Sequence, residues 1–143
     1  MAFTAIRRDE IREYVSPRDP DPEKPTVWLL GALDHRTRTY IDDMTTEFEV
    51  SSSSPKDKAK VSLRINERNF QLVRWGLRGW RNLLGEGGQD LAFDTDTVSI
   101  DGKSYKVVAQ RLMELLPYQV IAELAGQVDG QNRLSEAEKR NLG

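Results

Sequence analysis

Two tryptophans and a cluster of arginines lie close together in residues 68–88, the stretch that could carry the most chemistry. Aromatic rings can stack on nucleobases, and guanidinium groups can pair with phosphates. The candidates for such a site are Trp75, Trp80, Arg68, Arg74, Arg78 and Arg81. The tryptophans, however, fall on the apolar stripe of the helix expected here, whereas the arginines mostly project from its other side. With 21 basic and 23 acidic residues, the formal net charge is −2, so a solvated basic face is favoured over direct nucleic-acid binding.

The glycine-rich segment 85–88 does not have the pattern of a phosphate-binding loop. Such a loop needs a following lysine and a Ser or Thr at the start of a helix. Here the sequence GEGGQD follows the expected helix and carries acids that would repel phosphate. We interpret these glycines as a helix stop, because glycine accepts left-handed backbone conformations.

Metal-binding and catalytic chemistry have few candidates. The segment DTDTVSIDG resembles a calcium loop only at Asp94 and Asp96. The chain has no cysteine and one histidine, His35, which excludes thiolate chemistry and histidine clusters. Beside Asp34 at a helix start, His35 is expected to be an exposed residue of the capping region. A hydrolase with two carboxylates stays open, but we predict no enzyme activity, no catalytic residue, no cofactor and no metal site.

The elements that would position these residues begin with an apolar run at 26–33, TVWLLGAL, which predicts a strand buried on both faces. Asp34 can then N-cap a helix. Its apolar positions recur at helical spacing and are Tyr40, Ile41, Met44 and Phe48. Residues 51–60 are rich in serine and lysine and predict a mobile loop. The alternation in residues 60–65, KVSLRI, indicates a half-buried strand or an extended lead-in.

Asn66 can cap the next helix, which contains the two tryptophans. Apolar residues at spacings of three and four place one stripe on this helix. The stripe consists of Phe70, Val73, Leu77, Trp80 and Leu84. We expect Phe70, Leu77 and Trp80 to belong to the core.

The last third of the chain predicts a hairpin followed by helices. Asp101-Gly102 suits a tight two-residue turn that would place Val98 opposite Tyr105. A first helix should contain Val108, Leu112, Leu115 and Leu116. Pro117 should start a second helix, with Val120, Ile121, Leu124 and Val128 on its apolar side.

The C-terminal tail predicts a separate element. The segment DGQN, residues 129–132, should break the preceding helix. Ser135 and Glu138 then stand in capping-box register for a short tail helix.

Residues 1–25 predict an N-terminal arm with a proline-rich connector. Four prolines occur within residues 17–25, and each lacks a backbone donor, so this segment should be extended. Just ahead of it stand three possible anchors, Ile11, Tyr14 and Val15. Two alternatives stay open. In the first, the arm contacts a neighbouring subunit or partner protein and the domain from Thr26 onward folds without it; in the second, the arm supplies an edge strand to its own sheet.

Length and composition suit one domain. The chain has 143 residues, of which 38% are hydrophobic. Its start lacks the pattern of a signal peptide, and no apolar stretch approaches the roughly 18 to 20 residues that span a bilayer. We predict a soluble, intracellular α+β protein: a helix-dominated single domain over residues 26–143, with a small antiparallel sheet or hairpin and the extended arm.

The order of segments resembles that of tail assembly chaperones and related small morphogenesis proteins of long-tailed bacteriophages, over most of the chain from Thr26 onward. In that group a helix with a GW-N signature precedes a Gly-containing turn, an LP…I-EL helix and a polar LS-E-E-KN tail. The matching residues are Gly79, Trp80, Asn82, Leu116, Pro117, Ile121, Glu123, Leu124, Leu134, Ser135, Glu136, Glu138, Lys139 and Asn141. The proline-rich arm departs from this pattern and would equally suit a virion component that reaches onto a neighbouring subunit.

The resemblance implies a non-enzymatic protein that binds phage structural proteins, such as the tape measure, the tail tube or neighbouring virion subunits. It would act in the host cell cytoplasm, or in the virion, and could form a homo-oligomer. A tail assembly chaperone is the first hypothesis; a structural protein of the head, neck or tail is the alternative, followed by an inhibitor of a host defence protein. The residues assigned to partner binding are Ile11, Tyr14, Val15, Arg74 and Arg78.

Overall fold

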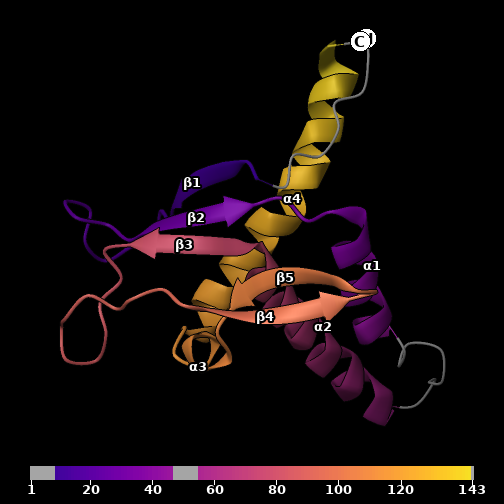
Figure 1. Ribbon diagram of the computed structural model, residues 1–143, viewed down its shortest axis with the longest axis horizontal. Coiled ribbons are helices and arrows are strands. Elements are labelled where there is room, and N and C mark those ends of the chain that lie inside the picture. Colours follow the sequence, from indigo (N-terminus) through magenta and orange to yellow (C-terminus); the bar gives the residue numbers. More distant parts are fainter. Residues whose placement is uncertain (1–8, 47–54, 143) are drawn as a thin grey trace.

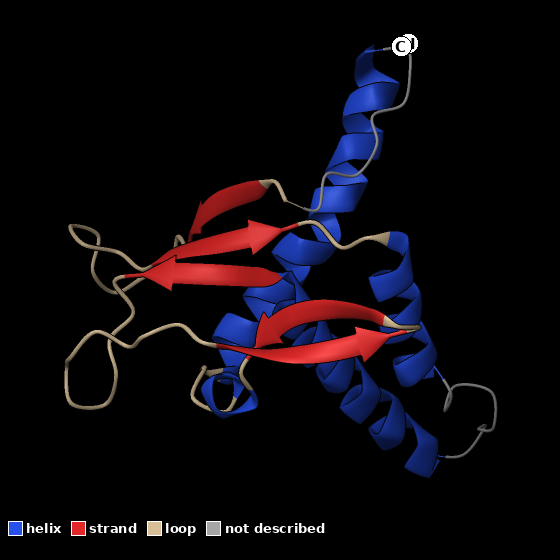
Figure 2. Ribbon diagram, viewed as in Figure 1, coloured by secondary structure: helices blue, strands red, loops and turns tan. Residues whose placement is uncertain are grey.

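Strands form one layer of the molecule, and helices α2 and α4 lie behind it (Figure 1). The computed structural model describes residues 9–46 and 55–142. The elements, in chain order, are strands β1 (Ile11–Val15) and β2 (Val27–Gly31), helices α1 (His35–Thr46) and α2 (Pro55–Gly76), strands β3 (Leu77–Arg81), β4 (Thr95–Ile100) and β5 (Lys103–Val108), and helices α3 (Gln110–Met113) and α4 (Tyr118–Leu142). The α+β class is confirmed, but the expected dominance of helix is wrong, because antiparallel sheets of three and two strands stand beside the four helices of the described residues (Figure 2).

The three-stranded sheet has the order β1-β2-β3, with both pairs antiparallel. Strand β1 pairs with β2 along its whole length, from Ile11 opposite Gly31 to Val15 opposite Val27. Residues 11–15 therefore form an edge strand of the chain's own sheet, which is the second of the two alternatives for the arm.

Local signals correctly predicted two elements. Strands β4 and β5 form a hairpin with Val98 opposite Tyr105. Its turn residues, Asp101 and Gly102, have φ angles of 51° and 81°, as a two-residue turn of this kind requires. Helix α1 is capped by Asp34, whose Oδ1 accepts a hydrogen bond of 2.8 Å from the backbone N–H of Thr37.

Helix α2 corrects three expectations. Residues 55–60 are helical, not part of a loop over 51–60; the segment 60–65 is not a strand; and Asn66 lies inside the helix instead of capping it. Proline is well suited to the first turn of a helix, and the lysines and alanine that follow Pro55 are good helix formers. Residues 51–54 and Phe48 lie outside the described residues.

The predicted helix through both tryptophans is also wrong in its second half. Helix α2 ends at Gly76, and residues 77–81 form β3, with Trp80 opposite Trp28. An irregularity in the pairing of β2 with β3 allows Leu77 and Trp80 to be buried although both belong to one strand. Leu84, the last residue of the expected stripe, is 59% exposed, and the glycines at 85–88 follow a strand instead of ending a helix.

At the C-terminus, α4 runs from Tyr118 to Leu142, so no separate tail helix exists. The segment 129–132 does not break it, since one glycine inside a helix costs only about 1 kcal/mol. The helix expected ahead of Pro117 is a single short turn, α3, and Leu115 is exposed beyond it.

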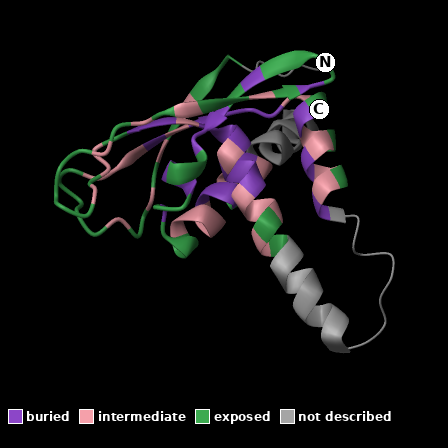
Figure 3. Cartoon of the chain, turned by 60° about the horizontal axis from the view of Figure 1, so that its bottom comes forward, coloured by how far each residue is buried: buried purple, intermediate pink, exposed green. Residues whose placement is uncertain are grey.

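The core lies where the sheets meet the helices (Figure 3). Trp80 packs edge-on against Trp28 and Phe93, at ring-centroid distances of 6.1 and 4.9 Å. A second cluster joins Trp75 to Tyr105 at 5.4 Å. Leu77 and Trp80 are buried as expected, whereas Phe70 is only partly buried.

Candidate protein-binding surface

Strand β1 alternates between two environments. Arg12 and Tyr14 are partly buried, whereas Ile11, Glu13 and Val15 are exposed. Successive side chains of a strand point to opposite faces, so one set faces the helices and the other faces away from them.

The inward set anchors β1 to α4. The Arg12 guanidinium donates to the backbone oxygen and the side-chain Oε1 of Gln127, at 3.3 and 3.4 Å. Burial, and then the neighbouring Glu123 carboxylate, raise the pKa of the Tyr14 hydroxyl. These contacts hold an edge strand on a helix that begins more than 100 residues later in the chain.

The outward set belongs to what we call the outer sheet face. The register places Ile11, Glu13 and Val15 opposite Gly31, Leu29 and Val27. Directly opposite residues share a face. The face continues onto β3, where Gly79 and Arg81 pair with Leu29 and Val27. Its side chains are Ile11, Glu13, Val15, Val27, Leu29, Arg78 and Arg81.

Val27 and Leu29 are only partly buried, so the expectation of a strand buried on both faces is wrong. Trp28 and Leu30, on the other face, are buried. Helices α2 and α4 lie on that inner side only (Figure 1). Strand β2 therefore contributes half of its side chains to an accessible apolar strip.

Arg78 lies flat across the sheet at Gly31. A Cβ at Gly31 would be 2.4 Å from the Arg78 Nε and 2.9 Å from its Cγ, so a larger residue there would displace the arginine. The Arg78 guanidinium also donates to the backbone oxygen of Ala32 at 2.9 Å. The glycine thus provides the space for a cationic side chain at one end of the face.

Glu13 and Arg81 form an ion pair of 2.7 Å across the same face. The pair links β1 to β3 over the intervening strand β2. Both side chains are more than half exposed, so the pair adds little stability, about 0 to 1 kcal/mol. Its effect is to hold two opposite charges over the apolar strip.

Three of the residues selected from the sequence therefore meet on one face: Ile11, Val15 and Arg78. Two do not. Tyr14 points inward, and Arg74 contacts the hairpin, where it donates to the Val108 oxygen at 3.1 Å and pairs with Asp96 at 3.2 Å.

The sequence interpretation did not assign Glu13, Val27, Leu29 or Arg81 to partner binding, although it considered Arg81 for a nucleic-acid site. The alternation in residues 11–15 could have assigned Glu13 to the face of Ile11 and Val15. No local signal could have found Arg81, which meets Glu13 from 68 positions away.

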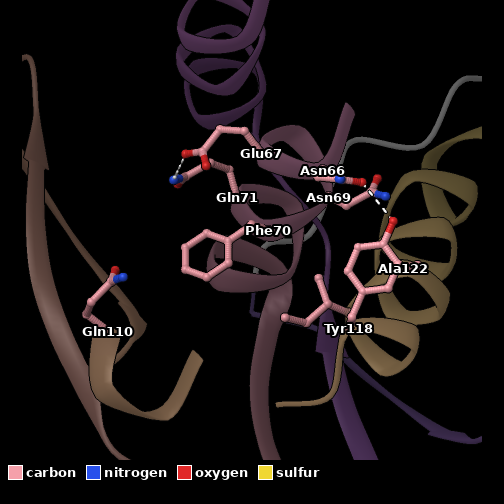
Figure 4. A pocket seen from close by; sticks show the side chains of 9 residues that line it. Asn66, Glu67, Asn69, Phe70, Gln71, Gln110, Tyr118 and Ala122 are labelled. Atoms are coloured by element: carbon pink, nitrogen blue, oxygen red, sulfur yellow. Dashed lines mark hydrogen bonds between the residues drawn. The ribbon is translucent and has the colours of Figure 1, made fainter. Parts of the chain in front are cut away.

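A second feature is an open groove of about 600 Å³ between α2, α3 and the start of α4 (Figure 4). It is lined by Asn66, Glu67, Asn69, Phe70, Gln71, Gln110, Tyr118, Ile121 and Ala122. The Tyr118 hydroxyl donates to Asn66 at 2.9 Å, and Gln71 donates to Glu67 at 3.0 Å. Carboxamides donate and accept hydrogen bonds, so the groove is suited to neutral polar groups above the Phe70 ring.

The polar residues considered for catalysis lie at the start of α1. His35 is exposed at the first position of α1, as expected. Asp34 caps that helix and accepts a hydrogen bond of 3.1 Å from the buried Tyr105 hydroxyl. Among residues 9–45 and 65–130, whose side chains the structure describes, no group of three or more His, Cys, Asp or Glu residues could hold a metal ion.

Comparisons with known proteins assign no relative: no protein-family model matches the chain, and neither does any curated protein or solved structure. In the part of the chain that the structure describes, none of the helices is both long and apolar enough to cross a membrane. The resemblance to phage assembly proteins therefore stays a hypothesis carried by the motifs alone.

Proposed function

We propose that the chain is a non-enzymatic bacteriophage assembly protein, and specifically a tail assembly chaperone, that binds phage structural proteins through its outer sheet face. The tape measure and the tail tube subunits are the proposed partners. The motifs around Pro117 and Ser135 support the phage hypothesis. The GW-N motif does not, because Gly79 and Trp80 lie on β3 and not at the end of a helix.

The observation that carries the binding part of the proposal is the meeting of Ile11, Val15 and Arg78 on one face. Ile11 and Val15 are 53% and 44% exposed, and partly buried Val27 and Leu29 continue the apolar surface between them and β3. Apolar side chains flanked by arginines are typical of protein interfaces, in which arginine is enriched and lysine depleted. The face contains no lysine.

The alternative is a structural virion protein of the head, neck or tail. The edge position of β1 favours it, because an edge strand can pair with a strand of a neighbouring subunit in a permanent assembly. The two hypotheses differ in whether the chain stays in the mature particle. An inhibitor of a host defence protein remains a third hypothesis, with no specific observation in its favour.

Analysis of purified phage particles by quantitative mass spectrometry separates the first two hypotheses. A chaperone should be present in infected cells and absent from mature particles. A structural protein should be found in the particles at a fixed ratio to the other subunits. Absence of the chain from a genome segment with phage morphogenesis genes would contradict both.

A further inference from the structure

The edge strand β1 is complementary to itself in an antiparallel pair. Its sequence, IREYV, runs from an apolar residue through a cation, an anion and an aromatic residue to a second apolar residue. We propose that a second copy of this chain pairs with the outer edge of β1, with Glu13 opposite its own counterpart on a two-fold axis. Two three-stranded sheets would then join into one continuous antiparallel sheet. The proposal goes beyond the proposed function, because it needs no phage partner.

Strand β1 is at the end of the sheet order β1-β2-β3, and among residues 9–46 and 55–142 no strand pairs with its outer side. The edge of a sheet presents backbone N–H and C=O groups that can pair with another strand. Helix α4 passes β1 on the helix side of the sheet (Figure 1).

Charged side chains usually deter such pairing. Both charged side chains of β1 are instead engaged within their own subunit. Arg12 donates to Gln127 on α4, and Glu13 pairs with Arg81 across β2. Each therefore extends toward its own subunit, away from the outer edge.

The register centred on Glu13 gives favourable neighbours at four of the five positions of β1. A two-fold axis perpendicular to the sheet leaves the outer faces of both copies on the same side of the joined sheet. Directly opposite residues must then share a face, so one residue of β1 has to lie opposite its own counterpart. Centred on Glu13, the pairing places Ile11 opposite Val15 and Arg12 opposite Tyr14. The glutamates meet on the axis, but each is already paired with an Arg81.

The two adjacent registers are worse. Centred on Arg12, the pairing places two arginines opposite each other and Ile11 opposite Glu13. Centred on Tyr14, it places Glu13 opposite Val15 and leaves Ile11 without a paired residue of β1. Cross-strand pairs each contribute about 0.2 to 1 kcal/mol. The register centred on Glu13 is preferred because it pairs Ile11 with Val15 twice, and because the charges of its one like-charge pair are each balanced by an Arg81.

The dimer would double the outer sheet face, with Ile11 and Val15 of the two copies adjacent along the seam. One short strand pair buries much less than the roughly 1,600 Å² of a standard interface. We therefore expect a weak dimer, with a Kd on the order of 10 µM to 1 mM.

The absence of cysteine from the chain allows a direct test of the register. Directly opposite residues have Cα atoms about 4.5 to 5.5 Å apart, which a disulfide can bridge. Under mild oxidation, the Glu13→Cys variant should form a covalent dimer. A mixture of Ile11→Cys and Val15→Cys chains should form the mixed dimer in preference to either homodimer. The Arg12→Cys variant should not crosslink, because two such residues would be diagonal neighbours about 7 to 8 Å apart.

The Ser99→Cys variant provides the background level, since Ser99 is an exposed strand residue on the separate hairpin. Circular dichroism melting should first show that every variant is folded. The proposal would be overturned if Glu13→Cys formed no more covalent dimer than Ser99→Cys. Efficient crosslinking of Arg12→Cys would also overturn it. Sedimentation of the unaltered chain at about 1 mM gives an independent readout: it should show dimer that Val15→Lys removes, and a monomer at that concentration would likewise overturn it.

Discussion

Gly76, at the end of α2, lies directly against the side chain of Val128 on α4. A Cβ at Gly76 would be 2.6 Å from one Val128 methyl carbon and 2.7 Å from the other. Both residues are buried. The crossing of the two helices therefore requires glycine at this position.

Replacing Gly76 by alanine should destabilise the protein by about 1 to 3 kcal/mol, because the valine cannot move away from the added methyl group without shifting α4. Gly126→Ala is the matched control. Gly126 is an exposed residue inside α4, with no atom within 4 Å of its added Cβ, so this change should stabilise by roughly 0.5 to 1 kcal/mol. Urea unfolding measures both, and equal effects of the two substitutions would contradict the close helix crossing.

Trp80→Ala should lower the free energy of unfolding by about 3 to 5 kcal/mol. Trp80 is buried between Trp28 and Phe93, and its indole N–H donates to the Leu91 oxygen at 2.7 Å. Leu84→Ala is the informative comparison, because the helical stripe would bury both residues. Leu84 is exposed, so its truncation should change stability by about 0.5 kcal/mol or less. A large loss for Leu84→Ala would favour the helix over β3.

The sequence predicted correctly those elements whose signals act between residues close together in the chain. Asp34 capped α1 and Asp101-Gly102 formed the hairpin turn, as predicted, because each acts on residues a few positions away. The spacing of Leu77 and Trp80 fits a helix equally well, and pairing with β2, about 50 residues earlier in the chain, determines that they lie on a strand. Tertiary pairing of this kind overrides local propensity.

The same distinction applies to the outer sheet face. Ile11 and Val15 could be selected from the sequence as apolar residues in a polar arm. Their meeting with Arg78 depends on the register of β1 with β2 and on the space at Gly31. Arg74 and Arg78 are both arginines of the same segment and could not be distinguished from the sequence, yet Arg74 contacts the hairpin.

A chain truncated to start at Thr26 should melt at a lower temperature than the full chain. The truncation removes β1, which exposes one edge of β2 and eliminates the contacts of Arg12 with Gln127. Thermal unfolding of the two proteins tests this expectation. Unchanged melting would instead support the first alternative for the arm, in which residues 26–143 fold independently.

Tyr14 should make the stability of the protein sensitive to alkaline pH. Its pKa is raised in the folded state, so its contribution is fully present below the unfolded value of about 10 and is lost as pH rises through the folded pKa. Between about pH 9 and pH 11, the unaltered protein should therefore lose more stability than the Tyr14→Phe variant. Urea unfolding across this range measures the difference; parallel curves for the two proteins would show that Tyr14 does not lie in the described environment beside Glu123.

The most direct measurement of the central claim is binding of the chain to the purified tail tube and tape measure proteins encoded in the same genome. Isothermal titration should compare the unaltered chain with a variant carrying Ile11→Lys and Val15→Lys, and with Leu115→Lys as a control at an exposed apolar residue away from the outer sheet face. We expect one of these proteins to bind the unaltered chain and the Leu115→Lys variant, and to bind the double variant at least tenfold more weakly, a loss of about 1.4 kcal/mol or more. Equal binding of all three chains, or no binding by any of them, would contradict the proposal that the outer sheet face docks a tail protein.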